Sequence, residues 1–219
     1  MSRNYELMQL MEKKTAPFAV TDDGVVQRIF LDHAPSPPRV VVFAAIDHGN
    51  GCSQVALSAA ETLGARACLV EANFRSPALP GMLGISNDLG LTDALQRPGD
   101  IRSFMKPLRR DGMWVLTAGP VGEDSPGLLS SESMRARIAE LRREFDFVLI
   151  DAAPVSPYGD VIPLGKMSDG VVLIVEAEST RREAARAAVD HLRACRIPVL
   201  GAVLNKRTFP IPEFLYSRL

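Results

Sequence analysis

The sequence contains few cysteines, and they lie far apart. Cys52, Cys68 and Cys195 form no CxxC pair, so neither a disulfide framework nor a zinc ribbon is indicated, and reduced cytosolic thiols are expected. No apolar run approaches the roughly 20 residues that cross a bilayer. The N-terminus also lacks the apolar core and cleavage site of a secretory signal. We therefore expect a cytoplasmic protein without a membrane span, which reaches a membrane only through a partner.

The sequence has no excess of charge of one sign. It holds 25 Lys and Arg against 26 Asp and Glu, for a net charge of −1. This balance gives no argument for a nucleic-acid partner or for binding to anionic lipid. With 47% hydrophobic and 23% charged residues in a length of 219, the composition is typical of a globular protein.

Two regions differ in pattern. Residues 4–14 place apolar side chains at roughly helical spacing, and residues 34–38 (APSPP) are rich in proline, which forbids regular hydrogen bonding. We interpret residues 1–38 as an N-terminal arm, a helix followed by a Pro-rich linker. The helix is either an ordinary packed first helix or a docking element. Residues 39–219 form the main domain.

Short apolar runs alternate with helical segments along the main domain. Runs without polar alternation are typical of strands buried on both faces of a parallel sheet. We predict an α/β fold in a single domain, doubly wound, with a mostly parallel sheet and helices on both faces. The predicted strands lie within 39–45, 66–72, 113–119, 145–154, 170–178 and 198–206, and the predicted helices at 54–65, 92–97, 100–108, 131–144 and 180–193.

A glycine-bearing loop follows the first of these strands. Backbone amides and the positive end of the next helix converge on an anion in such a loop. Against the pattern G-x-x-x-x-G-K-[ST], Gly51 and Ser53 match, whereas Cys52 stands at the lysine position. Ile46 replaces the first glycine. The missing cation removes a charge-assisted interaction worth about 1.5–3 kcal/mol. A reactive thiol of lowered pKa is a second interpretation of Cys52. The candidate phosphate-binding residues are Gly49, Asn50, Gly51, Cys52, Ser53 and Gln54.

Several segments in a fixed order carry a resemblance. The loop, CLVEANFRSP, GISNDLGLTDAL, FDFVLIDAAPV and GAVLNK together resemble the bacterial tyrosine kinases (BY-kinases) of capsule and exopolysaccharide export. That family belongs to the wider MinD/ParA group of P-loop ATPases. The resemblance extends from residue 39 to the end of the chain and implies a P-loop NTPase-like fold with ATP or ADP and Mg²⁺ as ligands.

The resemblance assigns roles to individual residues. The D-x-D-x-R pattern of active members corresponds to Glu71, Asn73 and Arg75, and Asn73 cannot act as a base. Asp151 matches the second metal-associated acid of the family. The implied catalytic residues are Glu71 and Asp151, the implied Mg²⁺ ligands Ser53 and Asp151, and the implied further nucleotide contacts Arg75 and Asn205, the latter at the family's adenine-contacting asparagine.

Two regulatory features of the family are missing. Active members carry a C-terminal tyrosine cluster, whereas Tyr216 is the sole tyrosine near this C-terminus. The ring-forming E-x-x-R-x-x-R motif does not occur in residues 1–38, so a homo-oligomeric ring is not indicated.

Three functions remain open from the sequence. The first is a catalytically impaired, pseudokinase-like regulatory or scaffold protein, which contacts the cytosolic tail of an inner-membrane polysaccharide co-polymerase or export protein through its N-terminal arm or residues 209–219. The second is an active ATP-dependent tyrosine kinase or ATPase using Ser53, Glu71 and Asp151. The third is a MinD/ParA-like nucleotide-switched ATPase, for which the expected lysine is absent from residues 46–48.

Overall fold

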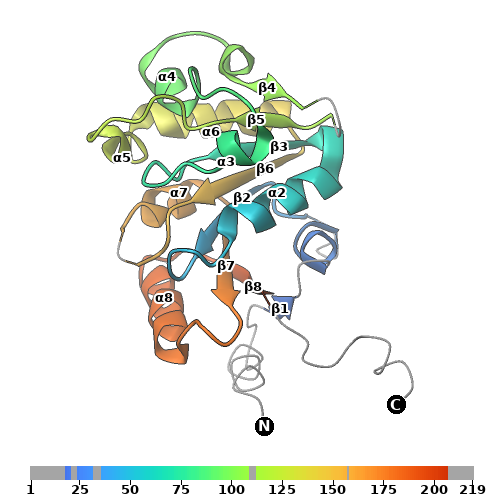
Figure 1. The fold of residues 1–219 in the computed structure, drawn as a ribbon, viewed down its shortest axis with the longest axis vertical. Coiled ribbons are helices and arrows are strands. Elements are labelled where there is room, and N and C mark those ends of the chain that lie inside the picture. Colours follow the sequence, from blue (N-terminus) through green and yellow to red (C-terminus); the bar gives the residue numbers. More distant parts are fainter. Residues whose placement is uncertain (1–17, 21–23, 32–35, 109–111, 157, 207–219) are drawn as a thin grey trace.

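The computed structural model describes residues 18–20, 24–31, 36–108, 112–156 and 158–206. The expected helix at 4–14 and the C-terminal segment 209–219 lie outside these ranges. The described residues form one eight-stranded sheet of order β1-β8-β7-β2-β6-β3-β5-β4 (Figure 1). The strands are β1 (Phe18–Val20), β2 (Val40–Ala45), β3 (Ala67–Glu71), β4 (Lys106–Pro107), β5 (Trp114–Leu116), β6 (Phe147–Ala152), β7 (Gly170–Glu176) and β8 (Val199–Asn205).

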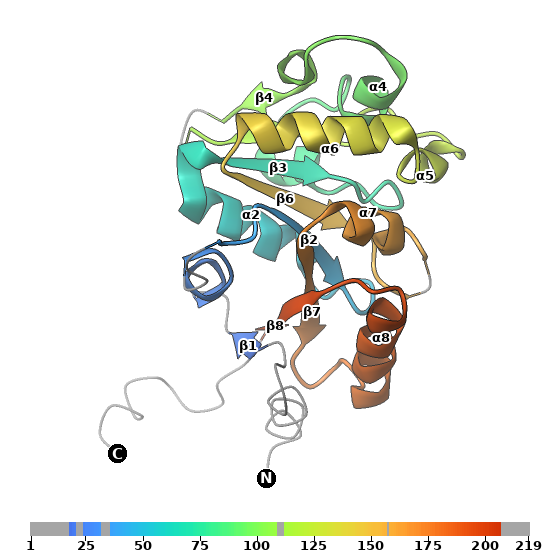
Figure 2. The ribbon, with the colours of Figure 1, turned by 180° about the vertical axis from the view of Figure 1, so that it is seen from behind.

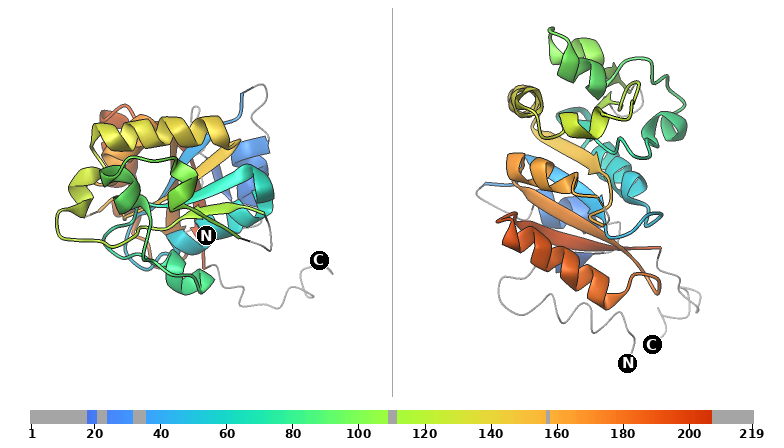
Figure 3. Two further views of the ribbon diagram at one scale, coloured as in Figure 1. Left: turned by 90° about the horizontal axis from the view of Figure 1, so that it is seen from above. Right: turned by 90° about the vertical axis from the view of Figure 1, so that its left-hand side faces the viewer.

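All neighbouring strands are parallel except β4 and β5, which pair antiparallel. Helices cover both faces of this sheet, as Figure 2 and the right-hand view of Figure 3 show. The predicted doubly wound, mostly parallel α/β fold is therefore confirmed. One face carries α2 (Cys52–Leu63) with the π-helical turn η2 (Gln27–Leu31), and the other carries α6 (Glu132–Glu144), α7 (Val161–Met167) and α8 (Arg182–Ala194).

Shorter helical segments complete the chain at the ends of the sheet. They are η3 (Gly64–Arg66), α3 (Leu79–Leu83), α4 (Leu91–Gln96), η4 (Ile101–Phe104) and α5 (Ser125–Leu128). No helix among the described residues is both long and apolar enough to cross a membrane.

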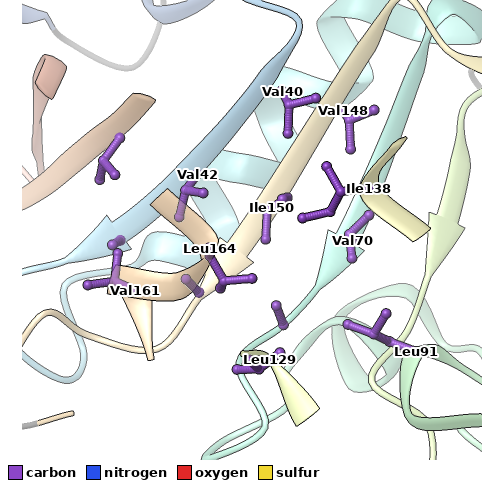
Figure 4. Packing of buried hydrophobic residues seen from close by; sticks show 14 of the residues in the cluster. Val40, Val42, Val70, Leu91, Leu129, Ile138, Val148, Ile150, Val161 and Leu164 are labelled. Atoms are coloured by element: carbon purple, nitrogen blue, oxygen red, sulfur yellow. The ribbon is translucent and has the colours of Figure 1, made fainter. Parts of the chain in front are cut away.

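The burial of strand β2 on both faces explains why its sequence lacks polar alternation. Every residue of β2 is buried, and successive side chains point to opposite faces of the sheet. Val40, Val42 and Ala44 join the apolar cluster beneath α6, α7 and α8, whereas the intervening residues join the cluster beneath α2. Figure 4 shows Val40 and Val42 in the first cluster, with Ile150 of β6 and Leu164 of α7. A strand covered on both sides has no position for a polar side chain.

Two described parts of the segment 1–38 pack on the main domain. Strand β1 pairs with β8, and the segment 24–31 buries Val25, Ile29 and Phe30. The Phe30 ring meets the Phe147 ring edge-on, with centroids 5.3 Å apart. The segment 24–31 of the expected arm therefore contributes to the core on the α2 side of the sheet, and β1 adds a strand to the sheet.

The prediction of a helix over residues 100–108 is wrong beyond Phe104. A single 3₁₀ turn, η4, begins at Ile101 and ends at Phe104, and the Asp100 carboxylate accepts a hydrogen bond from the Arg102 amide (2.8 Å). Pro107 has no N–H to continue a helix and biases the preceding residue towards extended backbone. Residues 106–107 accordingly form β4 against β5.

Candidate functional site

The loop between β2 and α2 lies at the carboxyl edge of the sheet, where ligands bind in open α/β folds. Gly49 and Gly51 adopt left-handed backbone conformations (φ 82° and 83°). Gly51 is the N-cap of α2 and supplies no capping side chain. No described residue accepts a hydrogen bond from the first three amides of α2. These amides are free to bind an anion.

The predicted loop residues converge on one cavity. Gly49, Asn50, Gly51, Cys52, Ser53 and Gln54 all line a cavity of about 270 Å³, together with Asn73 from the segment after β3. The structure thus brings the candidate phosphate-binding residues to a single place. The lining of this cavity includes Asp47 and His48 but neither lysine nor arginine.

Asn205, at the end of β8, is hydrogen-bonded to the loop. Its amide Nδ2 donates to the carbonyl of Asn50 (2.8 Å). A Cβ atom added at Gly51 would lie 2.4 Å from this nitrogen. The glycine is therefore required by the close approach of Asn205 as well as by its backbone conformation. In this structure Asn205 contacts the loop itself.

Two residues that the sequence analysis did not identify also fix the loop. The Lys206 ammonium donates to the carbonyl of Gly49 (2.6 Å) and lies 3.3 Å from the Glu176 carboxylate. Glu176 in turn accepts from Nδ2 of Asn50 (3.1 Å). The GAVLNK segment contained the signal for Lys206, since this lysine directly follows Asn205. Nothing local in the sequence marks Glu176.

Cys52 points from the start of α2 into the protein, beside Asp151 at the end of β6. Burial, and then the charge of Asp151, raise the pKa of the Cys52 thiol well above its usual value. The thiol is therefore neutral, and the interpretation of Cys52 as a reactive thiolate is wrong. The position that carries a cation in the P-loop pattern here presents a buried, uncharged group.

Asp151 is completely buried and unpartnered. Neither of its carboxylate oxygens accepts a hydrogen bond from any described residue. Burial raises the pKa of Asp151 to about 7, and the charge of Glu71 acts in the same direction. The hydroxyl of Ser53 and the thiol of Cys52 lie close enough to lower this pKa, but neither reaches the carboxylate with hydrogen-bond geometry. An orphaned carboxylate beside a phosphate-type loop fits a metal ligand.

Glu71 lies beside Asp151 in the register of β3 and β6 but has a different environment. One carboxylate oxygen accepts from the amides of Ala78 (2.6 Å) and Leu79 (2.7 Å), and the other from Ala118 (3.0 Å). Burial raises the pKa of Glu71, while these three hydrogen bonds oppose the shift. Glu71 thus ties the end of β3 to α3 and to the end of β5, and its carboxylate faces backbone amides.

Arg75 forms a paired contact outside the cavity. Its Nε and Nη2 donate to the two oxygens of Asp160 (2.9 and 3.2 Å). This hydrogen bonding raises the pKa of Arg75. The guanidinium also stacks over the Tyr158 ring, 4.6 Å from its centroid.

Comparison with known proteins supports the resemblance. No family model matches the chain. It is 29% identical over 160 residues to tyrosine-protein kinase YwqD of Bacillus subtilis, covering 72% of this chain and 68% of that protein. It is also 29% identical over 179 residues to the succinoglycan biosynthesis transport protein ExoP of Rhizobium meliloti, covering 79% of this chain and 23% of that longer protein.

Solved structures with a similar fold include bacterial tyrosine kinase domains and MinD. The kinase domain of VpsO is 25% identical, with a TM-score of 0.77 over 84% of this chain and 93% of that one. The septum site-determining protein MinD of Pyrococcus horikoshii, complexed with Mg-ADP, is 17% identical, with a TM-score of 0.62 over 82% of this chain and 76% of that one. The resemblance to bacterial tyrosine kinases and the P-loop NTPase-like fold are thereby confirmed.

Proposed function

We propose that this chain is a BY-kinase-like regulatory or scaffold protein of capsule or exopolysaccharide biosynthesis and export, in which phosphoryl transfer is impaired. The observation that carries the proposal is Cys52. At the position of the P-loop lysine it presents a neutral thiol, buried beside Asp151. Without a cation there, charge that develops during phosphoryl transfer lacks its main protein counter-charge.

The second strand supports the same conclusion. Asn73 cannot accept a proton as a carboxylate does, and Glu71 uses both oxygens on backbone amides. An active kinase or ATPase using Ser53, Glu71 and Asp151 would need Glu71 to leave these three hydrogen bonds. The alternative of an active enzyme is therefore the less well supported one.

Nucleotide binding is compatible with the site although catalysis is disfavoured. The free amides of α2 and the close backbone approach at Gly51 suit a phosphate group. Ser53 and Asp151 would hold Mg²⁺, and residues 49–54 would surround the phosphates of ATP or ADP. The bound Mg²⁺ would supply charge neutralisation. MinD of P. horikoshii was solved with Mg-ADP in a fold of this kind.

The named relatives suggest the process. YwqD is a tyrosine-protein kinase and ExoP a succinoglycan biosynthesis transport protein. We extend this context to the present chain and expect a cytoplasmic partner surface for an inner-membrane polysaccharide co-polymerase. Co-expression with the cytosolic segment of such a co-polymerase, followed by size-exclusion chromatography, tests this contact; two separate peaks would contradict it.

Catalytic impairment is tested by incubating the protein with Mg·ATP and measuring both phosphate release and phosphotyrosine. We expect neither signal above a buffer control, in the wild type or in Cys52→Ser, which keeps a small neutral side chain. Turnover by the wild type that Asp151→Asn abolishes would refute the proposal.

Binding is measured separately by thermal unfolding with Mg·ADP and Mg·ATP. A ligand at 100 times its Kd stabilises a protein by ~2.7 kcal/mol. For a chain of this size that corresponds to roughly 5–10 °C in Tm. A shift without turnover indicates a nucleotide-sensing protein, and no shift at millimolar nucleotide indicates a scaffold alone.

A further inference from the structure

The cavity beside the loop has no cation of its own among the described residues. Its lining includes the acidic Asp47 but neither lysine nor arginine. The Lys206 ammonium is engaged behind the loop with Gly49 and Glu176. A phosphate entering the cavity would therefore meet amides but no positive side chain, unless a neighbouring residue moves.

Arg75 is placed to supply that charge. Asn73 and Ser76, on either side of it in the sequence, both line the cavity. The relative solvent-accessible area of the Arg75 side chain is 36%, whereas that of the Asp160 side chain is 10%. Arg75 is therefore the more exposed member of the pair and the one that can change its position more easily.

A row of side chains connects Arg75 with the loop. Its guanidinium covers the Tyr158 ring, and the Tyr158 ring meets the His48 ring edge-on at 5.6 Å. His48 lines the cavity. Tyr158 thus contacts both the Arg75 guanidinium and the ring of a loop residue, and the face of its ring favours a cation.

The resemblance already implies a nucleotide contact for Arg75. We propose that Asp160 is the exchangeable counter-ion of Arg75, which holds the guanidinium in the absence of ligand and releases it to the polyphosphate of a bound nucleotide. The inference rests on the nucleotide binding proposed above. The exchange replaces one bidentate partner by another, because guanidinium pairs with carboxylate and with phosphate in the same fork geometry. Asp160 remains at the N-cap of α7, where a carboxylate is favoured.

The chain offers a matched control at the opposite edge of the sheet. Arg66, just before β3, donates to Asp146, just before β6 (2.8 Å), and its guanidinium covers the Phe147 ring at 5.2 Å. This pair repeats the arginine, carboxylate and aromatic ring of the Arg75 pair, but at the amino ends of the same two strands. Removing its carboxylate therefore changes the same type of contact far from the loop.

The test is calorimetric titration of Mg·ADP into the full chain and its variants. Asp160→Asn frees Arg75 and is expected to tighten binding about three- to tenfold, since the ligand no longer competes with a carboxylate. Arg75→Gln is expected to weaken binding about tenfold or more. Asp146→Asn should leave the Kd unchanged. Thermal unfolding without ligand establishes that each variant is folded.

A purely structural role for the pair predicts a different pattern, in which Asp160→Asn and Arg75→Gln weaken binding alike. That result, or an unchanged Kd in Arg75→Gln, would overturn the inference while leaving nucleotide binding intact. Binding by Asp160→Asn in the absence of binding by the wild type supports the counter-ion role and contradicts nucleotide binding by the native protein. Absence of binding in all variants overturns both.

Discussion

Replacing Gly51 by alanine should destabilise the protein more than the same change two residues earlier. Both Gly49 and Gly51 have φ near +80°, where a Cβ costs about 1–2 kcal/mol. A Cβ at Gly49 meets nothing within 4 Å, whereas at Gly51 it would lie 2.4 Å from Nδ2 of Asn205. Gly49→Ala is therefore a control for the backbone conformation alone.

The additional cost at Gly51 comes from Asn205. To make room, Asn205 must give up its 2.8 Å hydrogen bond to the Asn50 carbonyl, and a lost hydrogen bond costs about 0.5–1.5 kcal/mol. We expect the free energy of unfolding to fall by roughly 2–4 kcal/mol in Gly51→Ala and by only ~1–2 kcal/mol in Gly49→Ala. Urea denaturation monitored by circular dichroism measures both values.

A double-mutant cycle separates the contact from the backbone strain. In an Asn205→Ala background the clashing atom is gone, so Gly51→Ala should then cost no more than Gly49→Ala. Such non-additivity is the signature of residues in direct contact. Equal costs for the two glycine variants, or additive costs in the cycle, would refute the claim that Asn205 sets the shape of the loop.

Two further predictions concern the buried acids. Glu71→Gln should lower the free energy of unfolding by roughly 1–3 kcal/mol in chemical denaturation, because an amide nitrogen cannot accept from the backbone donors around this side chain. As a control, Glu61→Gln at an exposed position should change the free energy of unfolding by less than about 0.5 kcal/mol. Equal effects of the two substitutions would contradict the role assigned to Glu71. The pKa of Asp151 is raised to about 7 by burial, so the folded state binds a proton more tightly than the unfolded state, and this contribution to stability is present at low pH and lost as the pH rises towards 7. Asp151→Asn should therefore gain stability relative to the wild type between pH 4 and 7, by on the order of 3 kcal/mol in total, and a flat difference in urea denaturation across that range would contradict the shift.

Local patterns were sufficient for the central strands and for the loop. An unbroken apolar run such as that of β2 can be buried only between two layers, and a glycine-bearing segment between a strand and an alanine-rich helix predicts an anion-type loop. Ser131 before α6 illustrates the same kind of local signal, since its hydroxyl accepts from the Met134 amide (3.1 Å). Each of these features is determined by residues within a few positions of one another.

The pairings that set the character of the site could not be predicted from the sequence. Arg75 meets Asp160 across 85 positions, and Lys206 meets Gly49 across 157. Glu71 matched an acid of a catalytic pattern, but its role depends on the amides of Ala78, Leu79 and Ala118. Only Ala78 and Leu79 lie near Glu71 in the sequence. Side-chain partners of this kind depend on the folded arrangement of β3, β5 and β6, which no local pattern specifies.

The two neighbouring acids, Glu71 and Asp151, differ in how the fold compensates their charge. A buried carboxylate is costly unless hydrogen bonds or an opposite charge compensate it. Glu71 is compensated by three backbone amides, so the fold accounts for it fully. Asp151 is equally buried but accepts no hydrogen bond from a backbone amide. Its neighbour is the neutral thiol of Cys52, at the position where the P-loop pattern has a lysine whose charge would compensate the carboxylate. A bound cation would offset the charge of Asp151, and a ligand that brings Mg²⁺ to the loop would therefore stabilise the wild type more than Asp151→Asn.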